Sequence, residues 1–222
     1  MKPINVAIDG PSGAGKSTIA RAASEKLGYV YVDTGALYRT VALNVLRNGV
    51  SDKDVPAVIK TLKNLSVKLG FVDGAQHVYL NGEDVSSLIR TPEVSMAAST
   101  TSAIPEVRKF LFNLQREIAQ ENNCIMDGRD IGTVVLPDAQ VKIFLTASPE
   151  KRAERRYKEL IEKGIETTFE EVLKDVIERD YNDSHREIAP LKATEESIIV
   201  DTSDIDLQQS IDLIIKTIQE NI

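Results

Sequence analysis

Short apolar runs alternate with helical patterns along most of this chain. Residues 4–8 are rich in β-branched side chains and end at Asp9-Gly10, which predicts a strand followed by a turn. Residues 17–27 have helical character and stop at Gly28, a natural C-terminal cap. Further strands are predicted at 29–32, 124–126, 141–146 and 197–200. This alternation predicts an α/β fold with a five-stranded parallel sheet and helices on both faces.

Two stretches depart from this pattern. Residues 65–102 contain apolar runs at 67–72 and 77–80 on either side of Asp73-Gly74, which predicts an antiparallel hairpin inside an inserted subdomain. Residues 148–164 are charge-rich and predict a helix. Their composition alone favours a solvated helix face over a site. We therefore expect one domain spanning 1–222, with these two segments inserted in it.

Charge and cysteine content narrow the function. The 222-residue chain has a net charge of -7, which argues against nucleic-acid or membrane-surface binding. Cys124 is its single cysteine, so no disulfide can form within one chain, and this fits a reducing compartment. We see neither a signal peptide nor an apolar run of the ~18 residues that a membrane span needs. We expect a cytoplasmic protein.

A glycine-rich segment between the first strand and the first helix fits the phosphate-binding P-loop pattern. Backbone N–H groups of such a loop curl around phosphate oxygens, and the following helix presents its positive end. Lys16 would reach the β- and γ-phosphates, and the Ser17 hydroxyl would ligate Mg²⁺. The predicted ATP-binding residues of this segment are Gly10, Pro11, Ser12, Gly13, Ala14, Gly15, Lys16, Ser17 and Thr18.

Missing motifs then separate the P-loop classes. The chain lacks the Asp-x-x-Gly and Asn-Lys-x-Asp motifs of a regulatory GTPase and the Leu-Ser-Gly-Gly-type signature of a transporter ATPase. A kinase remains. If its acceptor is itself a phosphate, several arginines must offset the repulsion between the two reactants. Two alternatives to a kinase for a particular nucleoside monophosphate stay open. One is a P-loop kinase that phosphorylates a different acceptor, such as UMP or a phosphate-free metabolite. The other is a regulator that only senses ATP.

Candidate acceptor residues follow the predicted strands. Arg39 comes after the second strand, and Arg129 with Asp130 comes after the third. The carboxyl ends of parallel strands are where such sheets bind ligands. In the helix that begins near Phe169, an apolar stripe runs beside a polar strip of Arg179, Asp183 and Arg186. Taken alone, that strip reads as a surface ion-pair ladder. With two other arginine clusters present, we favour a site.

Several motifs together resemble the bacterial cytidylate kinases nearly end to end. The P-loop is shared widely, but the segments at 82–86 and 127–135 are more specific. The carriers are Asp9-Gly10-Pro11-Ser12-Gly13-Ala14-Gly15-Lys16-Ser17, Asp33-Thr34-Gly35-Ala36-Leu37-Tyr38-Arg39, Gly82-Glu83-Asp84-Val85-Ser86, Ile89-Arg90-Thr91, Asp127-Gly128-Arg129-Asp130-Ile131-Gly132-Thr133-Val134-Val135 and Glu178-Arg179-Asp180. The resemblance implies a P-loop three-layer fold in which 65–102 is a monophosphate-binding insert and 148–164 a helical lid.

The resemblance also implies a role for each site residue. Lid arginines close over the ATP phosphates, and the candidates are Arg152, Arg155 and Arg156. The acceptor phosphate is held by Arg39, Arg129 and Arg186, with help from Thr34. The sugar hydroxyls fall to Arg179 and Asp183. The base falls to Ser99, Arg108 and Asp130. The catalytic set implied is Lys16, Arg129, Arg186, Arg155 and Arg156.

The implied reaction is transfer of the γ-phosphoryl group of ATP to CMP or dCMP, directly and in line, with Mg²⁺ as cofactor. Ser17 stands where some relatives have Gly, so Ser17, Thr18 or water remain alternatives as the Mg²⁺ ligand. Cytosine offers an amino donor beside two acceptors, which a carboxylate and an arginine complement. Uracil would place a carbonyl against Asp130, at a cost of ~1–3 kcal/mol by analogy with base readout. We expect a monomer whose partners are ATP and CMP or dCMP.

Overall fold

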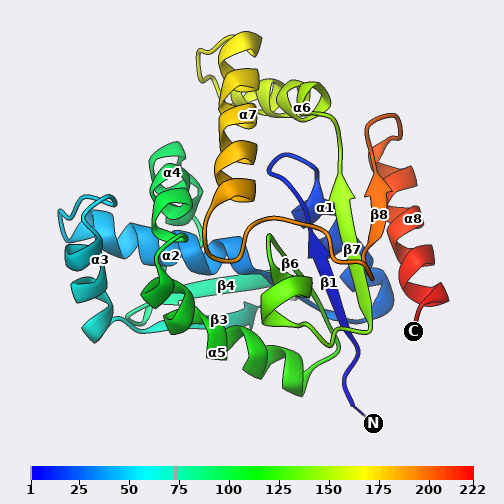
Figure 1. Ribbon diagram of the computed structural model, residues 1–222, viewed down its shortest axis with the longest axis horizontal. Helices are drawn as coiled ribbons and strands as arrows, with labels where there is room; N and C mark the ends of the chain where they lie inside the picture. The colour runs from blue at the N-terminus through cyan, green and yellow to red at the C-terminus, as the bar shows by residue number, and fades with distance from the viewer. Residues whose placement is uncertain (1, 73–74) are drawn as a thin grey trace. The chain divides into compact units, whose positions relative to one another are not determined.

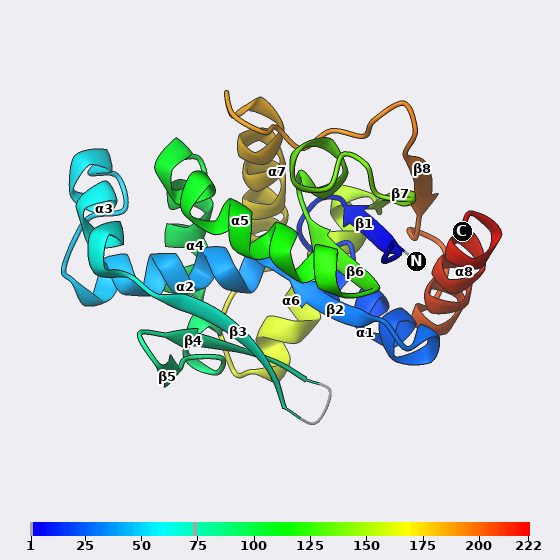
Figure 2. The ribbon, with the colours of Figure 1, turned by 90° about the horizontal axis from the view of Figure 1, so that it is seen from below.

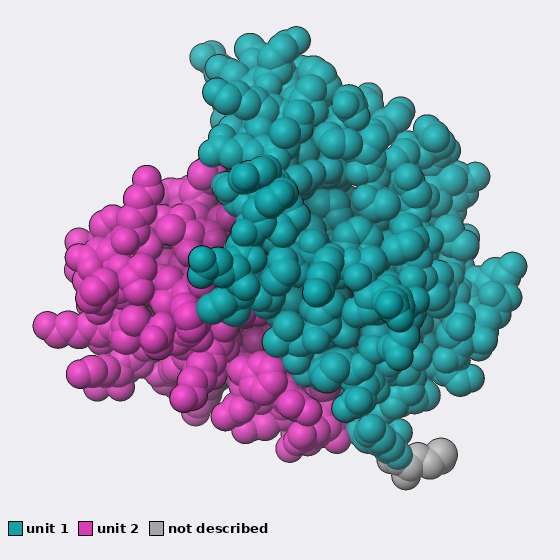
Figure 3. Space-filling model, viewed as in Figure 1, with its two compact units in different colours: residues 1–31, 122–222 teal, residues 32–121 magenta. Residues whose placement is uncertain are grey.

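The computed structural model describes residues 2–72 and 75–222, and these fall into two compact units. Unit 1 comprises residues 1–31 and 122–222, and unit 2 comprises residues 32–121 (Figure 3). Each unit has its own hydrophobic core. The prediction of a single domain with a monophosphate-binding insert at 65–102 and a lid at 148–164 stays a prediction.

The structure contains a five-stranded parallel sheet, as the alternating pattern predicts (Figure 1). Its order is β2-β6-β1-β7-β8. β1 lies at the centre and pairs in parallel with β6 and β7, and β7 pairs in parallel with β8. The strands are β1 (Asn5–Asp9), β2 (Val30–Asp33), β6 (Cys124–Gly128), β7 (Val141–Thr146) and β8 (Ile198–Asp201).

Alternate residues of these strands form one apolar face. On that face Val6, Ile8, Ile143 and Leu145 are almost completely buried. They pack against α1 (Lys16–Leu27) and α8 (Leu207–Glu220), which lie side by side (Figure 2). Because a strand's side chains alternate between faces, this face sets the register of the sheet. It thereby aligns the strands with one another, and the site is built at their carboxyl ends.

The remainder of unit 1 supplies the segments that carry charged side chains. β6 is followed by a single π-helical turn, η3 (Ile131–Val135), and β7 by α6 (Pro149–Glu162) and α7 (Phe169–His185). Val172 and Val176 anchor α7 on α6. The predicted apolar stripe of α7 is therefore present, although Ile177 at its edge is 52% exposed.

Unit 2 contains the predicted hairpin. β3 (Val67–Val72) and β4 (Ala75–Leu80) pair antiparallel, and the short β5 (Glu83–Asp84) completes a three-stranded sheet. Asp73-Gly74, the predicted turn, lies outside the described residues. The helical elements are α2 (Thr34–Arg47), α3 (Val55–Thr61), η1 (Leu62–Asn64), η2 (Leu88–Arg90), α4 (Pro92–Thr101) and α5 (Pro105–Glu121). α2 packs on α4, α5 and β4 around one core. In the described part of the chain, no helix is long and apolar enough to cross a membrane.

Candidate active site

The P-loop has the backbone geometry that phosphate binding requires. Gly10 has φ 153° and Gly13 has φ 77°, values that side-chain-bearing residues rarely adopt. A Cβ on Gly10 would lie 1.9 Å from the Leu145 carbonyl oxygen of β7, so only glycine fits there. The N-cap residue of α1 is Gly15, which has no side chain that could cap the helix. The first N–H groups of α1 are thus available to an anion, as in other helix-terminal phosphate sites.

Lys16 is buried at the start of α1, with its side chain folded onto the loop. Its Nζ donates to the Pro11 carbonyl oxygen at 2.8 Å. Burial, reinforced by the neighbouring Arg129, lowers the pKa of Lys16 to about 7, against the opposing pull of three aspartates. Burial removes the hydration of this ammonium group, and a bound phosphate would supply the negative charge that compensates for it. The loop therefore fits a polyphosphate.

Ser17 lies next to a carboxylate from the adjacent strand. The Ser17 hydroxyl donates to Asp127 Oδ2 at 2.9 Å, and the Tyr31 hydroxyl donates to Asp127 Oδ1 at 3.1 Å. Mg²⁺ is usually bound by one or two carboxylates together with hydroxyl, water and phosphate oxygens. In the described residues no group of three or more His, Cys, Asp and Glu could hold a metal ion. The Ser17-Asp127 pair fits a magnesium ion shared with a nucleotide better than a metal held by protein alone. Thr18, by contrast, is exposed on the first turn.

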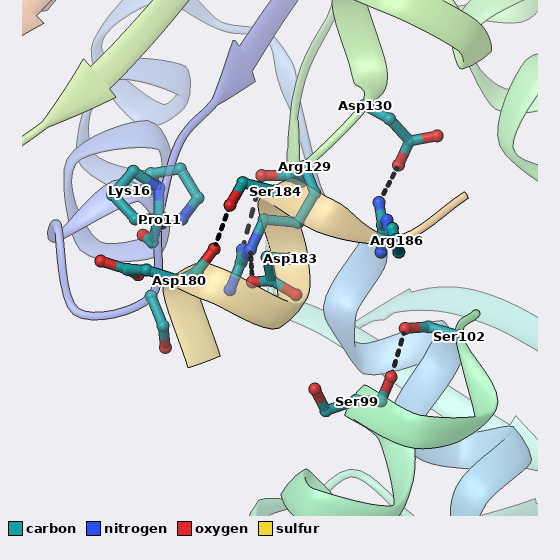
Figure 4. Close-up of polar contacts among 12 residues, drawn as sticks. Pro11, Lys16, Ser99, Ser102, Arg129, Asp130, Asp180, Asp183, Ser184 and Arg186 are labelled. Atoms are coloured by element: carbon teal, nitrogen blue, oxygen red, sulfur yellow. Dashed lines mark hydrogen bonds and ion pairs between the residues drawn. The ribbon is translucent and has the colours of Figure 1, made fainter. Parts of the chain in front are cut away.

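Arg129 and Asp130 lie just beyond β6 and contact the end of α7 (Figure 4). Arg129 Nε donates to Asp183 Oδ2 at 2.7 Å, and Arg186 Nη2 lies 3.5 Å from Asp130 Oδ1. Burial raises the pKa of Asp183, but Arg129 and then Arg179 and Arg186 outweigh it and hold that pKa below its usual range. Asp183 also raises the pKa of Arg129 against the effect of burial. Both partners therefore stay charged.

The structure shows separate surroundings for the three arginines of 148–164. Arg152 is buried, donates to the Ala147 and Ser12 carbonyl oxygens at 2.8 and 3.0 Å, and pairs with Asp180 through both terminal nitrogens. Arg155 donates to the Thr202 carbonyl oxygen at 2.6 Å. Arg156 pairs with Glu159 on its own helix. Their predicted contacts with ATP stay predictions.

In unit 2, Thr34 and Arg39 lie around Asp33. Thr34 is buried in the first turn of α2, and the Asp33 carboxylate caps that helix through the Ala36 N–H at 2.9 Å. Arg39 Nη2 donates to the same carboxylate at 2.9 Å. Arg39 Nε is buried and has no hydrogen-bond partner among the described residues. A buried donor of this kind fits an anionic ligand.

The remaining predicted base-reading residues also lie in unit 2. Arg108 is buried over the ring of Tyr38, with its guanidinium carbon 5.5 Å from the ring centre. It donates to the Ser102 carbonyl oxygen at 3.3 Å. Ser102 in turn donates to the Ser99 carbonyl oxygen at 3.0 Å (Figure 4). α4 and α5 therefore hold Ser99 and Arg108 near one another through Ser102.

Unit 1 brings five of the predicted residues, Lys16, Arg129, Arg179, Asp183 and Arg186, into one charged cluster. Lys16 lies close enough to Arg129 and Asp183 for their charges to act on it, and Asp183 is likewise affected by Arg179 and Arg186. Sequence reasoning missed four side chains that complete this environment: Asp9, Tyr31, Asp127 and Asp180. Asp9 is the last residue of β1 and Asp127 the last but one of the neighbouring β6, and that position was the signal that could have found them.

The sheet, the glycine loop and the buried lysine define a P-loop nucleotide-binding protein. Two solved structures share this fold: a gluconokinase from Sinorhizobium meliloti 1021, with a TM-score of 0.50 at 14% identity over 98% of this chain and 93% of that one, and the TT1252 protein of Thermus thermophilus, with a TM-score of 0.50 at 20% identity over 100% and 99%. Identities this low show the fold alone.

Comparison of sequences shows much closer relatives than these two structures. The profile of the family described as cytidylate kinase matches residues 6–220. A cytidylate kinase of Streptococcus pyogenes serotype M6 is 50% identical over 221 residues, 99% of this chain and 96% of its own length. One from Caldicellulosiruptor saccharolyticus is 48% identical over 209 residues, 94% of this chain and 92% of its own length. The chain belongs to the cytidylate kinase family, which confirms the resemblance seen in its motifs.

Proposed function

We propose that this chain transfers the γ-phosphoryl group of ATP to CMP or dCMP and releases ADP with CDP or dCDP. Family membership supports the acceptor. The observation that carries the chemistry is the buried cluster of unit 1, in which the P-loop lysine shares its surroundings with Arg129 and Asp183. A lysine suited to a donor phosphate and an arginine suited to an acceptor phosphate then act on the same transferring group.

On the donor side, the P-loop amides and Lys16 hold the β- and γ-phosphates. Lys16 leaves the Pro11 carbonyl oxygen for the phosphate, whose negative charge favours the protonated amine. Ser17 and Asp127 would hold a magnesium ion here, and that ion would supply positive charge against the phosphates. Arg155 and Arg156 then join Lys16 around the transferring group, and Arg152 supports the loop through Ser12.

On the acceptor side, Arg129, Arg186 and Arg39 bind the CMP phosphate, and Thr34 adds a hydroxyl. Guanidinium groups match the charge and the hydrogen-bonding geometry of a phosphate monoester. Arg179 and Asp183 bind the sugar hydroxyls. Asp130 accepts the cytosine amino group, with Arg108 and Ser99 on the remaining base edge. Each of these groups comes from this one chain, so we propose that it works as a monomer.

The acceptor oxygen of CMP is already ionised near neutral pH, so the reaction needs no strong general base. Catalysis comes from holding the acceptor oxygen in line with the γ-phosphorus and from the fixed cations around the transferring group. The phosphoryl group passes directly from ATP to CMP, and no protein side chain is phosphorylated. The bond from the γ-phosphorus to the ADP oxygen breaks as the bond to the CMP oxygen forms.

A matched pair of lysine variants tests this proposal. Lys16→Met should lower CMP-dependent ADP and CDP formation by at least about a hundredfold, as expected when a charge-stabilising donor is lost. Lys26→Met is the control, because Lys26 lies on the same helix, is 54% exposed and pairs with exposed Asp212. Its rate should match the wild type. Undiminished CDP formation by Lys16→Met would refute the donor-side assignment. If added CMP did not change the rate of ADP formation by the wild type, the assignment of CMP as acceptor would be refuted.

A further inference from the structure

Asp9 is a buried carboxylate that the reaction described above does not use. It is the last residue of β1 and is only 6% exposed. Its Oδ1 accepts the Ile131 N–H at 2.8 Å, and its Oδ2 accepts the Gly132 N–H at 2.7 Å. Both oxygens are thus committed to two successive backbone donors of a segment more than a hundred residues away in the sequence.

Those two donors open the η3 turn, whose N-cap residue is Asp130. The first N–H groups of a helical turn have no partner inside it, and an aspartate at the N-cap ordinarily supplies one with its own side chain. Here Asp130 makes no side-chain cap, and its Oδ1 lies 3.5 Å from Arg186 Nη2 instead. The cap is supplied from outside by Asp9. Asp9 therefore caps the turn, and the Asp130 carboxylate remains directed towards Arg186.

We infer that Asp9 is a positioning residue for the acceptor nucleotide: by capping η3 it holds the 129–132 segment so that the Asp130 carboxylate faces Arg186. This inference rests on the proposed role of Asp130 and Arg129 in binding CMP. Asp9 also directly precedes Gly10, so the same residue ties the acceptor segment to the first residue of the P-loop. An altered Asp9 would affect acceptor binding first, because its side chain contacts the acceptor segment.

The fit around Asp9 is close, and its charge is costly. A Cβ on Gly132 would lie 3.4 Å from Asp9 Oδ2, so the turn approaches the carboxylate to within van der Waals contact. Burial raises the pKa of Asp9 to about 6; Asp130 adds to this, and the two N–H donors and Lys16 oppose it. Since the folded protein binds this proton more tightly than the unfolded chain, stability from Asp9 falls as pH rises towards 6. At pH 7.5 the charge is a cost, which a neutral asparagine avoids.

Asp9→Asn is therefore the variant to measure. Asparagine keeps the shape and one acceptor oxygen, but its amide group turns N–H donors towards the second backbone N–H. Loss of one hydrogen bond to a charged group predicts a rise of about tenfold in KM for CMP. The KM for ATP should stay within about twofold, and the preference for CMP over UMP should fall. Amide exchange of Ile131 and Gly132, followed by NMR, should quicken specifically in this variant.

Asp206→Ala is the matched control for loss of a cap. Asp206 is exposed and caps α8 through the Gln209 N–H at 2.8 Å, so its removal should leave both KM values unchanged. An unchanged KM for CMP in Asp9→Asn, or an equal rise in both KM values, overturns the inference. If Asp9→Asn does not fold, Asp9→Ser, whose shorter side chain removes the carboxylate from both N–H groups, is held to the same KM and exchange results.

Asp130→Asn, measured alongside, separates the two claims. If it raises KM for CMP while Asp9→Asn does not, the positioning role of Asp9 fails and the acceptor site stands. If Asp130→Asn itself leaves the KM for CMP and the CMP preference unchanged, the proposed acceptor site fails.

Discussion

The ion pair between Arg129 and Asp183 should be one of the strongest single interactions in unit 1. Its Nε–Oδ2 distance is 2.7 Å, and the two side chains are 20% and 9% exposed. Removing one partner of a buried pair typically costs about 3–5 kcal/mol. Arg129 keeps some contact with water, and an asparagine at 183 could still accept one hydrogen bond. For Asp183→Asn we therefore expect a loss of about 2 kcal/mol, or roughly 4–8 °C in Tm for a chain of this size.

A double-mutant cycle in urea isolates the pair from its surroundings. Asp183→Asn, Arg129→Met and the double variant, unfolded without ligand at pH 7.5, should give a coupling energy of about 1–2 kcal/mol. The m-values should stay equal, which would show that only stability has changed. A coupling energy below about 0.5 kcal/mol would refute the reasoning, because it would place this pair with ordinary surface ion pairs.

Acid adds a second, independent check on the same pair. Arg129 holds the pKa of Asp183 below its value in the unfolded chain. The stability that Asp183 contributes is therefore fully present above the unfolded pKa of about 3.9 and is lost as pH falls through the lower folded pKa. The stability difference between wild type and Asp183→Asn should shrink below about pH 4. A difference that stayed constant down to pH 3 would contradict the assigned ion pair.

Three further changes test other parts of the structure. Arg152→Lys should cost about 2 kcal/mol in urea unfolding and raise KM for ATP, because lysine cannot reproduce the two-pronged Asp180 pair; unchanged stability would contradict this. Cys124 is buried, and burial raises the pKa of its thiol to about 12, so iodoacetamide at pH 8 should label only unfolded protein, as mass spectrometry would show. Gly10→Ala should abolish ATP binding in a titration, since its Cβ would meet Leu145.

Much of the architecture could be predicted from periodicity and turn residues. All five strands of the sheet and the β3–β4 hairpin fall where short apolar runs predicted them, with ends that differ by one or two residues. The predicted end of the third strand, at Met126, falls two residues short, because β6 continues to Gly128. Parallel pairing continues through Asp127 even though that residue is charged, because Ser17 and Tyr31 satisfy its carboxylate.

The site was less predictable, because local sequence patterns do not reveal the order of the strands in the sheet. Ser17 and Asp127 meet only because β6 is the neighbour of β1 in the sheet. The same neighbour relation brings the Ile131 N–H to Asp9. Arg152 was also hard to predict. The composition of 148–164 favoured a solvated helix face, yet the Arg152 guanidinium is buried against Asp180. Burial of a charged side chain depends on a partner that only the fold supplies.

The central claim is that this chain phosphorylates a cytosine nucleotide. A coupled assay with ATP and Mg²⁺ across CMP, dCMP, UMP, AMP and GMP tests it most directly. We expect CMP and dCMP to be the preferred acceptors, with kcat/KM for CMP roughly ten- to a hundredfold above that for UMP, as a mismatch of about 1–3 kcal/mol at the base predicts. Equal kcat/KM values for UMP and CMP would contradict the cytosine assignment.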